Sequence, residues 1–85
     1  MNQAIQFPDR EAWSEEDRMI YFPVLIGGFQ RECRISAAQL QMRFGGTDAD
    51  SWLALFREHR WDIEDLFEAQ VLNEQDDTEG YYSLS

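Results

Sequence analysis

The chain contains one cysteine, Cys33, and one histidine, His59, and these two residues carry the chemistry of a possible nucleophilic site. A thiolate beside an imidazole is activated for acyl transfer, and an accessible thiolate can act as a redox sensor. Both residues fall among apolar neighbours in the predicted elements, where cysteine and histidine are usually packed in a core. We therefore interpret Cys33 and His59 as core residues and keep a small enzyme or thiol sensor as an alternative function.

Other catalytic and metal-binding patterns are missing from the sequence. One Cys and one His cannot furnish a Cys/His zinc site, and Asp62, three residues after His59, adds only a single helical pair. All seven basic residues are Arg, which excludes a Schiff-base lysine and a phosphate-loop lysine. No glycine-rich phosphate cradle, G-x-S-x-G or H-E-x-x-H motif is present. We predict a protein that is not an enzyme and that holds no metal or cofactor.

Three residues near the middle of the second half suggest recognition: Arg57, Arg60 and Trp61. Arg and Trp dominate the anchors of protein interfaces, and Arg57 and Trp61 lie four residues apart, so they can stack on one helix face. In a second interpretation the two arginines pair with neighbouring acids such as Glu64, while Trp61 packs at the start of a helix. We take Trp61, Arg57 and Arg60 as the candidate protein-binding residues.

Acidic residues outnumber basic ones by 17 to 7, which gives a net charge of -10 and an isoelectric point near 4.2. This charge opposes binding to a phosphate backbone or an anionic lipid surface and favours basic partners. We therefore predict a small non-enzymatic interaction or regulatory protein that binds a protein partner or itself, with no nucleic acid and no membrane.

Two alternatives use the charged residues differently. A nucleic-acid-associated regulator would use Arg31, Arg34 and Arg43 locally against the global charge. A protein that mimics the phosphate backbone of DNA would use a set of acidic residues: Asp62, Glu64, Asp65, Glu68, Glu74, Asp76, Asp77 and Glu79. Such a set is more often simply a solvated acidic face.

The length of 85 residues predicts one α+β domain over residues 1–85, because chains divide into separate cores only beyond about 250 residues. The first four residues form neither a basic n-region nor an apolar h-region, and a lone Cys cannot close an intramolecular disulfide, so we expect a cytoplasmic protein. The longest apolar stretch, residues 19–28, is about half the roughly 20 residues that a membrane span needs.

The elements that position these residues begin with strands. Residues 5–7 alternate as a short first strand before Pro8, and residues 9–17 read as a polar connection. Residues 19–26 and 29–35 form a β-hairpin around Gly27-Gly28, because a two-residue primed turn needs positive φ. The hairpin's core face is apolar except for Arg31, and Pro23 marks an edge strand, so further strands should add beside residues 29–35. Residues 81–84 alternate as a last strand, with one Tyr facing the core.

Helices are expected between the hairpin and the last strand. Ser36 and Gln39 form a capping-box pair for a short helix that Gly45-Gly46 ends, and Thr47 opens a second, longer helix. Its apolar stripe keeps phase across residue 59, so we favour one continuous, if kinked, helix over a break with Asp62 as N-cap and Trp61 stapled onto Leu66. The acidic segment 73–80 is expected to be frayed.

The predicted fold is α+β, with a small antiparallel sheet of N-terminal strand, glycine hairpin and C-terminal strand packed on a short and a long helix. The chain resembles the bacterial family called "domain of unknown function 1488" over nearly its whole length. Five fragments carry the resemblance: Ile5-Gln6-Phe7-Pro8-Asp9, Tyr21-Phe22-Pro23, Cys33-Arg34-Ile35-Ser36, Arg43-Phe44-Gly45 and Phe56-Arg57-Glu58-His59-Arg60. The resemblance implies a small α+β fold in a bacterial cytoplasm and brings no activity, ligand or catalytic residue with it.

Overall fold

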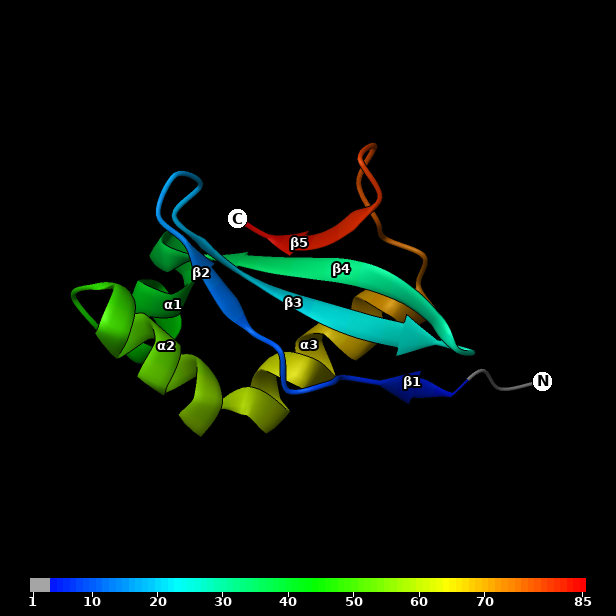
Figure 1. Ribbon diagram of the computed structural model, residues 1–85, viewed down its shortest axis with the longest axis horizontal. Helices are drawn as coiled ribbons and strands as arrows, with labels where there is room; N and C mark the ends of the chain where they lie inside the picture. Colours follow the sequence, from blue (N-terminus) through cyan, green and yellow to red (C-terminus); the bar gives the residue numbers. More distant parts are fainter. Residues whose placement is uncertain (1–3) are drawn as a thin grey trace.

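Five strands and three helices make up the part of the chain that the computed structural model describes, residues 4–85 (Figure 1). Residues 1–3, on which part of the expectation about the N-terminal sequence rests, lie outside the described residues. The strands are β1 (Ile5–Gln6), β2 (Ala12–Ser14), β3 (Met19–Ile26), β4 (Phe29–Ser36) and β5 (Tyr81–Leu84). The helices are α1 (Ala37–Phe44), α2 (Ala49–Glu58) and α3 (Arg60–Leu72).

The central hairpin of β3 and β4 confirms the predicted turn and register. Ile26 opposes Phe29, and the pairing continues through Phe22 with Cys33 to Ile20 with Ile35. Gly27 and Gly28 have φ values of 58° and 89°, the positive range that a two-residue primed turn requires.

The edge of the sheet beside β3 differs from the prediction. Both β1 and β2 pair with β3, antiparallel, on either side of Pro23: β1 opposite Leu25 and Ile26, and β2 opposite residues 19–21. The expectation that residues 9–17 form a plain connection is therefore wrong for β2, and the first strand adds beside β3 rather than β4. Proline has no N–H to donate at this edge, so the two short partners pair with β3 only on either side of it.

The last strand corrects the expectation of a purely antiparallel sheet, because β5 runs parallel to β4, with Cys33 opposite Tyr82. After β4 the chain leaves the hairpin's open end through α1 and α2, and α3 carries it back beneath the sheet to the turn end, where β5 starts in the direction of β4 (Figure 1). Tyr82 faces the core, as predicted for one of the two tyrosines.

The segment before β5 is fixed by hydrogen bonds rather than frayed as expected. The Asp77 side chain accepts hydrogen bonds from the backbone N–H groups of Glu79 and Tyr81 and from the Ser83 hydroxyl. These bonds and the N–H of Asp77, which donates to the Tyr81 carbonyl, cap the outer edge of β5 at its first residue.

Both helix starts follow capping chemistry, with differences in detail. Ser36 caps α1 by accepting from the Gln39 N–H at 3.1 Å, as predicted, but the Gln39 amide donates to the Ser85 carbonyl instead of turning back to the cap. The N-cap of α2 is Asp48 with Ser51 at N3, not Thr47, and this pair forms the reciprocal capping box.

The predicted continuous second helix is in fact two helices, α2 and α3, that meet at His59 and run in different directions (Figure 1). His59 has φ -103° and ψ 24°, outside helical values, while its N–H still donates to Leu55 and its carbonyl accepts from Ile63. The alternative of a break in this region is confirmed, but the break lies at His59 and Asp62 is not the N-cap. Because the chain turns at residue 59, Trp61 lies in the first turn of α3 and is exposed instead of stapled onto Leu66.

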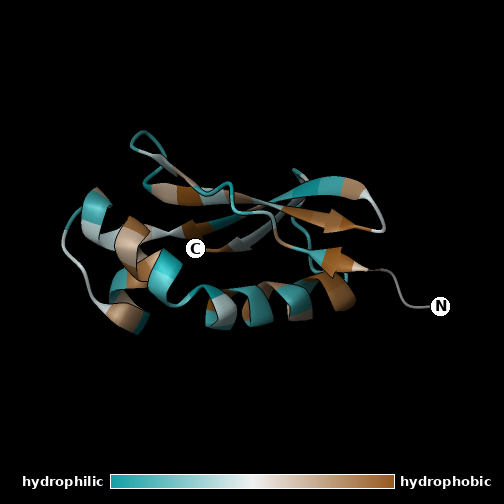
Figure 2. Ribbon diagram, turned by 60° about the horizontal axis from the view of Figure 1, so that its bottom comes forward, coloured by the Kyte–Doolittle hydropathy of each residue, from teal (hydrophilic) through white to brown (hydrophobic). Residues whose placement is uncertain are grey.

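All three helices cover one face of the sheet, and the core lies between these two layers (Figure 2). The Phe22 ring of β3 stands at the centre, with its centroid 4.9 Å from that of Phe56 on α2 and 4.8 Å from that of Phe67 on α3. Four residues of the apolar stripe predicted from Trp52 through Phe67 are buried: Trp52, Phe56, Ile63 and Phe67. Leu66 packs partly buried against them, so the side predicted to face the core is confirmed although the helix is broken.

Candidate functional site

Two of the three predicted recognition residues, Arg57 and Arg60, converge on one carboxylate, Glu11. Arg60 reaches the Glu11 carboxylate at 2.6 Å and donates to the Pro8 carbonyl at 2.7 Å, while Arg57 Nε lies 2.8 Å from the other Glu11 oxygen. Only 14% of the Arg60 side chain and 11% of the Glu11 side chain are exposed. The two arginines therefore attach residues 8–11 to the junction of α2 and α3, which agrees with the interpretation that they pair with acids.

Arg60 also contacts Glu64, one turn along α3, at 2.8 Å. Burial would raise the pKa of Glu11, but hydrogen bonds from the Arg57 side chain, a backbone N–H and the Arg60 side chain lower that pKa below its ordinary value. For Glu64 the balance is reversed, because burial raises its pKa more than the charge and hydrogen bond of Arg60 lower it. Arg60 therefore stabilises the fold through its contacts with Glu11, Glu64 and the Pro8 carbonyl.

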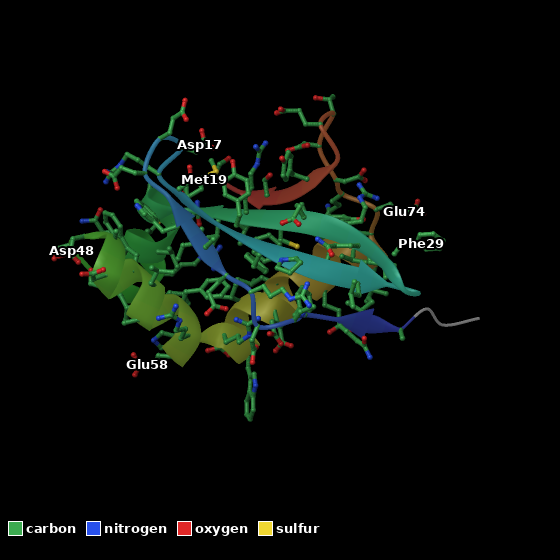
Figure 3. All side chains as sticks on the ribbon, in the orientation of Figure 1. Asp17, Met19, Phe29, Asp48, Glu58 and Glu74 are labelled. Carbon is green, nitrogen blue, oxygen red and sulfur yellow. The ribbon has the colours of Figure 1, made fainter. Side chains whose placement is uncertain are left out.

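Trp61, the third predicted residue, is the most exposed large apolar side chain among the described residues, at 84%. It does not share the environment of Arg60, whose guanidinium lies over the Phe56 ring at 5.5 Å. Trp61 instead helps to line a shallow hollow with Glu58, His59 and Asp62 at the helix junction. The Glu58 side chain points away from the protein there (Figure 3). The structure therefore separates an exposed aromatic residue from two arginines that serve the fold.

Sequence reasoning missed a second exposed apolar residue on α3, Leu72, which is 68% exposed. Trp61, Asp65, Glu68 and Leu72 are spaced i, i+4, i+7 and i+11, so they share one side of the helix, and all four are exposed. We call these four residues the outer stripe of α3. The spacing is visible in the sequence, but two acidic residues separate Trp61 from Leu72, so this side does not form an apolar stripe like the one that begins at Trp52.

Cys33 and His59 are not brought together as a nucleophile and a base. Cys33 lies in the core on β4 with no exposed surface, and burial raises the pKa of its thiol to about 12. The His59 ring stacks on Phe44 with centroids 4.1 Å apart and lies 3.9 Å from the Asp62 carboxylate and 4.0 Å from that of Glu58. Cys33 is a core residue, as interpreted from the sequence, whereas 34% of the His59 side chain is exposed at the junction of α2 and α3.

The arginines assigned to the nucleic-acid alternative are also engaged within the protein. Arg31 donates to Asp76 and to the Gly80 carbonyl, each at 2.9 Å. Arg34 pairs with Asp77 at 2.8 Å and lies over the Tyr81 ring at 4.3 Å. Both side chains therefore fasten the segment before β5 to the sheet.

The third arginine of that alternative, Arg43, donates to the side chain of Gln39 on α1. Tyr21, which lies opposite Arg34 on the neighbouring strand, packs edge-on against Tyr81 and donates to Asp17 at 2.8 Å.

Residues 4–85 contain no helix that is both long and apolar enough to cross a membrane. Within the same residues, no three His, Cys, Asp or Glu side chains are grouped so that they could hold a metal ion.

The fold and its surface define a small α+β protein with one exposed, acidic helix face. The chain belongs to the family described as "Protein of unknown function (DUF1488)", whose model matches residues 5–84. This match confirms the resemblance seen in the sequence.

Named relatives agree with this membership. The chain is 47% identical to the "Uncharacterized protein YrdB" of Escherichia coli (strain K12) and 46% identical to the protein of the same name in Shigella flexneri, in each case over 99% of both chains. It also superposes on the crystal structure of a DUF1488-family protein of unknown function from Shewanella loihica PV-4, with a TM-score of 0.88 and 27% identity. That comparison covers 99% of this chain and 94% of the other.

Proposed function

We propose that this protein acts without catalysis, as a small interaction or regulatory protein that binds a protein partner through the surface around Trp61. The observation that carries the proposal is the exposure of the Trp61 side chain, 84% of which is open to solvent. Tryptophan is the residue most enriched among interface hot spots, because its large ring loses much solvent contact when a partner covers it.

The position of Trp61 supports this role. It follows Arg60 directly, and Arg60 is held by Glu11, Glu64 and the Pro8 carbonyl, so the first turn of α3 is fixed relative to the sheet. An anchor on a rigid element loses little conformational entropy when it binds. The surrounding carboxylates of Glu58 and Asp62 are exposed and keep this face soluble when no partner is bound.

The alternatives have less support. A nucleic-acid regulator would need free arginines, whereas two of its three arginines, Arg31 and Arg34, pair with carboxylates. A thiol sensor would need an accessible thiolate, whereas Cys33 is buried.

The proposal is tested by capture from a nuclease-treated bacterial lysate with the tagged full chain, using wild type, Trp61→Ala and Met42→Ala. Met42 is a matched control, because it is an exposed apolar residue on another helix, α1. We expect a protein that wild type and Met42→Ala retain equally and that Trp61→Ala retains at least about tenfold less. Equal capture by Trp61→Ala, capture of nothing, or a large loss of folding stability in Trp61→Ala would overturn the proposal.

A further inference from the structure

The outer stripe of α3 places two apolar side chains on either side of two carboxylates, and this arrangement indicates the chemistry of a partner. At about 100° per residue, Trp61, Asp65, Glu68 and Leu72 fall within about 60° of each other around the helix axis. The buried residues Ile63 and Phe67 lie on the opposite side. At about 1.5 Å per residue, Trp61 and Leu72 stand about 16 Å apart along the axis, with the two carboxylates between them.

The charged side chains of this face are carboxylates. Asp65 and Glu68 are exposed, and the exposed carboxylates of Glu58 and Asp62 lie beside Trp61. The two arginines that precede Trp61 in the chain, Arg57 and Arg60, already pair with Glu11. A positively charged surface therefore complements this face.

A second copy of this chain does not complement it. If the outer stripes of two copies faced each other, Asp65 and Glu68 of one copy would lie against the same two carboxylates of the other. Each chain also carries a net charge of -10. Like charges across an interface are unfavourable. The occupant must therefore be a different, basic molecule.

A partner is less suited to bind by adding a strand beside β5, because backbone groups at the outer edge of β5 already form hydrogen bonds within the protein. Tyr81 donates to the Asp77 carboxylate at 3.0 Å and its carbonyl accepts from the Asp77 N–H at 2.8 Å. The Ser83 carbonyl accepts from the Gln70 amide at 2.9 Å. An incoming strand would have to displace these bonds.

We propose that the partner presents a basic amphipathic helix that lies along the outer stripe of α3, with two apolar residues about three turns apart contacting Trp61 and Leu72. Lys or Arg residues between these two anchors would pair with Asp65 and Glu68. Helices pack along one another through such rows of side chains, and paired charges between apolar anchors set the register. This inference rests on the proposed function and adds the chemistry of the partner.

The test uses two synthetic 18-residue helical peptides with leucines eleven residues apart, one with lysines and one with glutamates on the face between the leucines. Binding to the full chain is measured by the anisotropy of a dye on the peptide at two salt concentrations. Two charge-matched variants are compared, Asp65→Asn with Glu68→Gln, and Glu16→Gln with Asp50→Asn, each of which removes two exposed carboxylates.

We expect the lysine peptide to bind wild type and the second variant alike, and the stripe variant about tenfold more weakly, with a loss of affinity at high salt. Equal weakening in both variants would mean unspecific attraction to an acidic protein and would overturn the inference, as would equal binding of the glutamate peptide. If the lysate experiment still depends on Trp61 in that event, the proposed function stands and only the basic helical partner is wrong.

Discussion

Glu11 and Arg60 lie 2.6 Å apart although 49 positions separate them in the chain, and less than a sixth of either side chain is exposed. Replacing one partner of such a pair leaves the other charge poorly solvated. We expect Arg60→Ala to lower the free energy of unfolding by about 2 kcal/mol, and Arg57→Ala, whose side chain is 59% exposed, by less than about 1 kcal/mol. Urea unfolding measures both values, and equal losses would contradict this ranking.

The same carboxylate makes stability depend on pH in acid. Burial would raise the pKa of Glu11, but its hydrogen bonds lower the folded-state pKa below the ordinary value of 4.5. The folded state thus binds this proton less readily than the unfolded state, so Glu11 contributes stability above pH 4.5 that is lost as the pH falls through its folded pKa. Wild type should lose more stability than Glu11→Gln below pH 4.5, as measured by urea unfolding at each pH. Parallel pH profiles for the two proteins would refute this assignment.

Local chemistry was enough to predict the hairpin and the start of α1. The register of β3 and β4 follows from Gly27-Gly28 and the alternation around it, and the cap of α1 follows from Ser36, because both depend only on neighbouring residues. The parallel pairing of β5 could not be predicted in this way, since it depends on how far α3 carries the chain back across the sheet.

The site was harder to predict than the fold. Arg57, Arg60 and Trp61 are neighbours in sequence, but the partner of both arginines is Glu11, in a segment predicted to be a plain connection. The turn at His59 then directs Trp61 outward. No periodicity within α2 or α3 reports a contact with residues 8–11, so the separate roles of these residues required the tertiary structure.

Alanine substitutions at Gly45 and Gly46, between α1 and α2, separate the cost of backbone strain from the cost of steric overlap. Both have positive φ, 95° and 93°, but only at Gly46 would a Cβ meet the Trp52 ring, 2.6 Å from Cδ1. We expect Gly45→Ala to lower the free energy of unfolding by about 1–3 kcal/mol, because φ 95° with ψ -147° is a conformation that essentially only glycine adopts, and Gly46→Ala to lower it by more, because the overlap with Trp52 is added. Urea unfolding of the two variants tests this order, and equal losses would show that Trp52 can move aside.

Cys33 should react only when the protein unfolds. Its thiol is buried, and burial raises its pKa to about 12, so little thiolate is present at pH 8 and the reagent has no access. We expect labelling by an aromatic disulfide reagent to follow the unfolding rate measured independently in the same buffer. Fast labelling of the folded protein would revive the thiol-sensor alternative.

The fluorescence of Trp61 measures the electrostatic potential around the outer stripe without a partner. Trp13 and Trp52 pack together with ring centroids 5.5 Å apart, and the Trp52 ring is buried, whereas Trp61 is exposed beside carboxylates. A cationic quencher is concentrated near such a surface and an anionic quencher is repelled. Caesium should therefore quench the Trp61 fluorescence more strongly, relative to free tryptophan, than iodide does.

Two variants locate the effect. Trp61→Phe should remove most of the quenchable emission, and Asp65→Asn with Glu68→Gln should reduce the preference for caesium, while Glu16→Gln with Asp50→Asn should leave it unchanged. High salt should reduce the preference in wild type, because screening weakens attraction between exposed charges. If iodide and caesium quench wild type equally well at low salt, the face around Trp61 lacks the negative potential on which recognition of a basic helix depends.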